Sequence, residues 1–89
     1  MMRNKEIEMT KKDLPALIVA VLSALGGSGT REDVAWKVKE AVDRLVDPAD
    51  PFIFKWYYNL GWAKNDLKNA GIVALRKGKD LRKPEWYLV

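Results

Sequence analysis

The sequence predicts a small, mainly helical α+β domain in which three helices are followed by a β-hairpin. Apolar residues recur every three to four positions in three separate stretches before residue 71, as in helices that bury one face. Residues 72–89 instead hold two short runs of strand-forming residues around a basic turn. The 89 residues suffice for one domain, expected over residues 10–89, with residues 1–9 as a flexible N-terminal segment.

The first helix is expected over residues 14–25, with Asp13 as its cap and Pro15 in its first turn. Gly26 and Gly27 should end it. Its apolar stripe comprises Leu14, Leu17, Ile18, Val21, Leu22 and Leu25. The GGSG segment that follows lacks the Gly-Lys-Ser/Thr of a phosphate-binding loop, so we interpret it as a helix stop and a tight turn.

The second helix is expected over about residues 31–46. Thr30 and Asp33 resemble a capping box at its start, with Asp in place of the usual Glu or Gln. The inner stripe should consist of Val34, Val38, Ala41, Val42 and Leu45. Trp36 falls off this stripe, beside Glu40 and Asp43, so its indole has no predicted place in the core.

The third helix follows a break at the DPADP segment, with Asp50 as its cap and Pro51 in its first position. Its inner stripe should be Trp56, Leu60, Ala63, Leu67 and Ala70. At 100° per residue, the opposite face gathers Tyr58, Trp62, Asn65 and Asn69. Lys55 and Asp66 border that face on one edge, and Lys64 and Lys68 flank the core stripe on the other.

The hairpin is expected from strands at residues 72–75 and 85–89. The turn between them is basic and contains Arg76, Lys77, Lys79, Arg82 and Lys83. Charge is unevenly distributed along the chain. Residues 1–54 carry eight Lys or Arg against nine Asp or Glu, whereas residues 55–83 carry eight against two. This asymmetry favours a partner that is a polyanion.

A helix pair, a third helix and a hairpin with a charged tip form the layout of a winged helix-turn-helix. In that fold the third helix enters the major groove of duplex DNA and the hairpin tip, or wing, lies on the backbone. The expected helix contacts are Lys55, Tyr58, Asn59, Trp62, Lys64, Asn65, Lys68 and Asn69. The alternative is an ordinary solvated helix face beside a turn whose lysines discourage strand aggregation.

The segment NLGWAKNDLKNAGI is similar to the end of the recognition helix in the amino-terminal domain of Mrr-type restriction proteins. The shared pattern is Gly61-Trp62-Ala63-Lys64, then Leu67-Lys68, then Ala70-Gly71-Ile72. The similarity of layout covers most of residues 13–89, whereas the specific motif covers about twelve positions. The resemblance implies a winged-helix fold and DNA binding, without nuclease chemistry. It also implies that Trp62 could pack under the wing instead of facing a ligand.

Aromatic residues are concentrated in the PFIFKWYY segment, which one helix face cannot bury completely. Phe52, Phe54 or Tyr57 could pack with Trp36 as a satellite core, as a homodimer contact, or as a platform for stacked bases. A second function therefore stays open, in which a winged-helix module binds another protein through Trp36 and residues 52–58.

Several function classes find no support in the sequence. The chain has no histidine or cysteine, and Ser23 and Ser28 have no recognisable partner, so we expect no enzyme activity. We also expect no metal, cofactor or small-molecule substrate. No apolar run reaches the ~20 residues of a membrane span, and a cytoplasmic location is expected. The absence of glutamine and cysteine, with 31% charged residues, is compatible with a thermophilic source.

Overall fold

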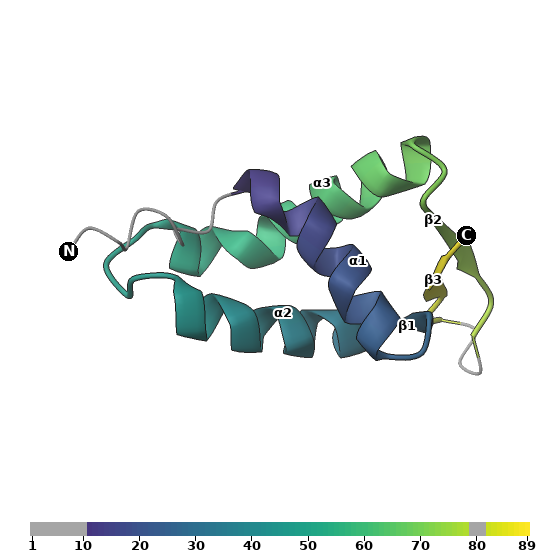
Figure 1. Ribbon diagram of the computed structural model, residues 1–89, viewed down its shortest axis with the longest axis horizontal. Coiled ribbons are helices and arrows are strands. Elements are labelled where there is room, and N and C mark those ends of the chain that lie inside the picture. The colour runs from purple at the N-terminus through teal and green to yellow at the C-terminus, as the bar shows by residue number, and fades with distance from the viewer. Residues whose placement is uncertain (1–10, 79–81) are drawn as a thin grey trace.

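The computed structural model describes residues 11–78 and 82–89 (Figure 1). A 3-10 turn at Lys11–Asp13 precedes the main elements. These are α1 (Leu14–Ala24), β1 (Ser28–Thr30), α2 (Arg31–Leu45), α3 (Phe52–Asn69), β2 (Val73–Arg76) and β3 (Glu85–Leu88). The expected N-terminal segment, residues 1–9, and Lys79 of the basic turn lie outside the described residues. The mainly helical α+β class and the order of the three helices and the hairpin are confirmed.

The three strands form one antiparallel sheet in the order β1-β3-β2. In the hairpin, Val73 lies opposite Leu88 and Arg76 lies opposite Glu85. On the other edge of β3, Gly29 of β1 lies opposite Trp86. The sequence predicted only a turn at residues 28–30, which was wrong. This strand has no apolar alternation, and it exists because the distant β3 offers it backbone hydrogen bonds.

The core forms where the apolar stripes of the three helices meet the inner face of the sheet. Its buried members are Leu14, Ile18, Val21, Leu22, Val34, Val38, Ala41, Val42, Val46, Phe52, Leu60, Ala63, Leu67, Val73 and Trp86. Leu17, Leu25 and Trp56 of the predicted stripes are partly buried and pack against this core, whereas two other predicted core residues are exposed. Leu45 is exposed, because the extended backbone at Val46 turns that residue inward instead. Ala70 is exposed because it is the C-cap of α3, where the chain leaves the helix.

The helix ends follow their local sequence in most cases. Thr30 and Asp33 form the predicted capping box, with both side chain to backbone hydrogen bonds at 3.1 Å. Asp50 accepts a hydrogen bond from the Phe52 N–H at 2.9 Å, although α3 starts one residue later than expected. Asp13 occupies the predicted N-cap position of α1, but without a capping hydrogen bond. Its backbone is already helical, so its side chain makes no capping hydrogen bond.

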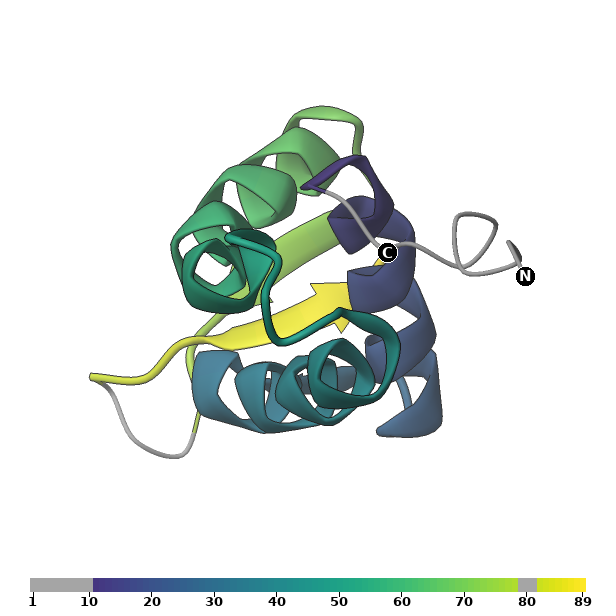
Figure 2. The same ribbon diagram turned by 90° about the vertical axis from the view of Figure 1, so that its left-hand side faces the viewer.

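The helices leave one side of the molecule open. α2 and α3 run alongside each other, and α1 packs across one side of this pair (Figure 1). In the end-on view, the described parts of the connection between β2 and β3 project on the side opposite α1 (Figure 2). We call the side of the α2–α3 pair that α1 covers the covered side, and the opposite one the open side.

Candidate nucleic-acid interface

The outward face of α3 carries aromatic and amide side chains. Tyr58, Trp62 and Asn65 follow one another at intervals of four and three residues, so they lie on one face of the helix. All three are exposed, and Tyr58 exposes 72% of its surface. Asn69 extends the row and is also exposed. This arrangement matches the predicted grouping, and it offers hydrogen-bond donors and acceptors next to flat apolar rings.

Trp62 and Trp86 have opposite environments. Trp62 exposes 55% of its surface, whereas Trp86 of β3 exposes 3%. The alternative in which Trp62 packs under the hairpin is therefore excluded. Trp86 occupies the inner face of the sheet instead, because its register places it opposite Leu75 with both side chains toward the helices.

The basic residues of α3 occupy different positions around the helix. Lys55 and Lys68 are exposed, whereas Asn59 and Lys64 are half-buried. The Lys64 ammonium lies 5.8 Å from the centre of the Trp86 ring, a cation–π contact between α3 and β3. Burial lowers the pKa of Lys64 from its ordinary value, and the positive charges of Lys68 and Arg31 lower it further. Lys64 therefore reaches the edge of the core and lies near other cations.

Arg76, the last residue of β2, contacts two residues of β3, and the connection that follows carries further exposed cations. Arg76 donates a hydrogen bond from Nε to Glu85 Oε1 at 2.9 Å and stacks over the Tyr87 ring at 4.8 Å. It therefore stabilises the outer face of the hairpin. Lys77, Arg82 and Lys83 are exposed. The sequence analysis did not distinguish Arg76 from the other cations of this segment. The partners of Arg76 lie across the sheet, and they depend on the strand register.

Arg31, which the sequence analysis did not select, lies beside the outward face of α3. With Tyr57, Gly61 and Asn65 it lines a hollow of about 500 Å³, whose remaining walls are Tyr58 and Trp62. Its guanidinium carbon lies 5.0 Å from the centre of the Tyr57 ring. The sequence signal was a cation in the first position of α2, directly after the capping residue Thr30. Only the packing of α2 against α3 brings this cation to the site.

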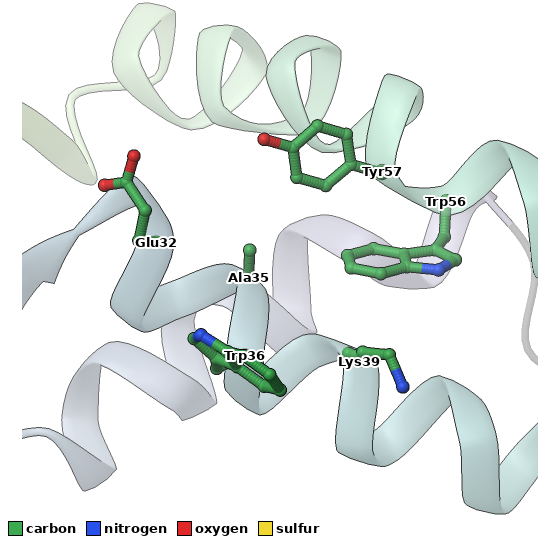
Figure 3. A pocket seen from close by; sticks show the side chains of 6 residues that line it. All are labelled: Glu32, Ala35, Trp36, Lys39, Trp56 and Tyr57. Atoms are coloured by element: carbon green, nitrogen blue, oxygen red, sulfur yellow. The ribbon is translucent and has the colours of Figure 1, made fainter.

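A second hollow of about 270 Å³ lies between α2 and α3 and also includes Tyr57. Its walls are Glu32, Ala35, Trp36, Lys39, Trp56 and Tyr57. Figure 3 shows the rings of Trp56 and Tyr57 extending from α3 above α2, which carries Trp36. Trp56 and Tyr57 meet edge to face, with their ring centres 5.6 Å apart. The hollow is mostly apolar and flanked by one acid and one base.

The predicted aromatic interface is only partly present. Trp36 and Tyr57 line the second hollow, and Phe54 is 85% exposed nearby on α3. Phe52 was assigned wrongly, because it is buried in the core. It lies four residues before Trp56, and this spacing places it on the inner face of α3.

Comparison with known proteins gives no match for this chain: no family model, no curated protein and no solved structure is similar to it. The resemblance to the Mrr-type amino-terminal domain thus stays a prediction. Within residues 11–78 and 82–89, no helix is long and apolar enough to cross a membrane. The same residues contain no cluster of three or more acidic side chains arranged to hold a metal ion.

Proposed function

We propose that this protein is a winged helix-turn-helix domain that binds duplex DNA without catalysing a reaction. The order α1-β1-α2-α3-β2-β3 and the strand order β1-β3-β2 support the fold assignment. In this arrangement α3 enters the major groove, and the connection between β2 and β3 lies on the flanking phosphate backbone. The Mrr-like motif in residues 61–72 agrees with this role.

The observation that carries the proposal is the outward face of α3, where Tyr58, Trp62 and Asn65 are exposed in one row. A helix that only supported a core would gain nothing from two large exposed rings beside an amide. The asparagine amide can pair with adenine through two hydrogen bonds, and tyrosine commonly contacts phosphate oxygens. The α3 face therefore combines direct base readout with backbone contacts.

The cations support the same assignment. Lys77 and Lys83 are exposed on the connection between β2 and β3, whose described parts project on the open side (Figure 2). Cations at such a position neutralise phosphates and release counterions, which gives affinity that does not depend on sequence. A cytoplasmic regulator of transcription or a chromatin-associated protein fits these features better than an enzyme does.

Fluorescence anisotropy of a labelled duplex of about 20 base pairs, titrated at several salt concentrations, tests this function. We expect binding that weakens steeply as salt increases. Lys83→Ala should reduce the slope of log K against log salt by about one, because one phosphate contact is lost. Lys37→Ala removes the same charge from an exposed site on α2 and serves as the matched control. Absence of binding at low salt would reject the proposed function.

The hollow between α2 and α3 favours protein binding as a second candidate function. Trp36 is 68% exposed and lines a mostly apolar hollow. Exposed tryptophans in such hollows often anchor protein–protein interfaces. The two hollows meet at Tyr57, so a protein bound there would lie next to the α3 face. Sedimentation velocity over a range of concentrations tests a homodimer. Concentration-dependent association that Trp36→Ala abolishes would support it.

A further inference from the structure

The hollow lined by Arg31 is formed by side chains and backbone of two helices, α2 and α3. Arg31 approaches it from the start of α2, whereas Tyr57, Gly61 and Asn65 approach it from α3. The Tyr57 ring lies under the guanidinium and restricts its orientation. The cation is thus held in one place by two helices.

Arg31 occupies an unfavourable position in the free protein. It is the first residue of α2, where the helix dipole favours acids such as Glu32 and Asp33 and disfavours a cation. Its Nε is buried and has no hydrogen-bond partner among the described residues. Arg31 and Lys64 also repel each other, since the Arg31 charge contributes to the lowered pKa of Lys64. An anion in the hollow would offset the two costs that come from charge, at the helix start and next to Lys64.

Gly61 supplies a second, independent observation at the same hollow. It lies inside α3 without a positive φ angle, so the backbone does not require glycine there. A Cβ at this position would meet only the Arg31 Nη atoms, at the ordinary contact distances of 3.9 and 4.0 Å. Packing among the described residues therefore does not require glycine either. Glycine does leave the floor of the hollow as bare backbone, which permits close approach by a ligand.

We propose that this hollow is a phosphate site that holds one backbone phosphate of the bound DNA, with Arg31 as its main ligand. The Arg31 guanidinium donates to the phosphate oxygens through its Nη nitrogens, and the Asn65 side chain stays available for a base. Tyr58 and Trp62 form the walls beside the sugar. This inference rests on the proposed DNA-binding function and adds a contact from α2 that fixes the register of α3 on the duplex.

Arg31→Gln tests the site, with Arg44→Gln as the matched control. Arg44 lies in the last turn of the same helix and is exposed, about 20 Å from Arg31 along the axis. In the anisotropy titration, Arg31→Gln should weaken duplex binding at least tenfold and reduce the salt slope by about one. Arg44→Gln should stay within about twofold of the wild type, since no contact is lost.

Thermal unfolding followed by circular dichroism separates this role from a structural one. The melting temperature of Arg31→Gln should stay close to that of the wild type, because loss of the Tyr57 contact is offset by removal of an unfavourable cation from a helix start. Gly61→Ala keeps Arg31 but fills the floor, so it should raise the melting temperature and weaken binding. A stable Arg31→Gln variant with wild-type affinity and salt slope would overturn the phosphate site.

Three further outcomes show whether the phosphate site alone or the whole proposed function is wrong, and which compound supplies the anion. If the wild type binds duplex with a steep salt dependence and Arg31→Gln binds equally well, only the phosphate site is wrong. If the wild type binds no duplex at all, the proposed function fails with it. Inorganic phosphate could instead change the tryptophan fluorescence of the wild type, but not of Arg31→Gln, while no duplex binds. This result would assign the hollow to a small phosphate compound and overturn the DNA contact.

Discussion

The two sides of the α2–α3 pair use similar residues for different purposes. On the covered side, apolar side chains of both helices pack against α1 and the sheet, and Trp86 closes that core. On the open side, Trp36, Tyr58 and Trp62 expose more than half of their surface. Aromatic content alone does not separate these sides. The difference teaches that the protein forms its hydrophobic core without the aromatic rings of the open side. Those rings are therefore available for binding.

The matched pair Trp86→Ala and Trp62→Ala should give the largest difference between the two sides. Loss of the buried Trp86 ring should reduce the free energy of unfolding by about 3–5 kcal/mol. Loss of the exposed Trp62 ring should change it by no more than about 0.5 kcal/mol. Chemical denaturation of both variants measures these values. Equal destabilisation by the two substitutions would mean that Trp62 belongs to the core.

Asn65→Ala tests the open side at a smaller scale. If Asn65 pairs with a base, the variant should lose about 1–3 kcal/mol of discrimination between the preferred duplex and a mutated one. Its stability should hardly change, because the side chain is exposed. Competition titrations against a panel of duplexes measure the discrimination. Uniform weakening on every duplex would assign Asn65 to backbone positioning instead.

Lys64, at the border between the two sides, should give the smallest effect. Its pKa is lowered in the folded protein, so the unfolded chain binds more protons between that pKa and 10.5. The Lys64 contribution to the free energy of unfolding should therefore increase as pH rises through this window. Comparing wild type with Lys64→Met at pH 7 and at pH 10.5 isolates it. A contribution that falls with pH would show that the Trp86 ring stabilises the ammonium more than burial opposes it.

Local patterns in the sequence were enough to predict most of the covered side. Leu14, Ile18 and Leu22 repeat with helical spacing, and that spacing alone determines which face of α1 is buried. The capping box of Thr30 and Asp33 is likewise a relation between near neighbours. These features depend on residues within one or two turns, so they can be read without tertiary structure.

The remaining features depend on contacts between distant segments. β1 forms only because β3 pairs with it, and Trp86 is buried only because the hairpin register turns it inward. Arg31 reaches the α3 face through helix packing, which periodicity within α2 does not encode. Helical spacing predicted the row of Tyr58, Trp62 and Asn65 on the outward face of α3. It did not predict the hollow that places Arg31 beside this row.

An NMR titration of the ¹⁵N-labelled protein with duplex DNA tests the central claim most directly. The four tryptophans each have an indole N–H, and they sample the open side, the second hollow and the core. If the outward face of α3 binds DNA, the Trp62 indole signal should shift strongly while the Trp86 signal stays in place. Shifts confined to Trp36 and Trp56, or as large at Trp86 as at Trp62, would contradict the account.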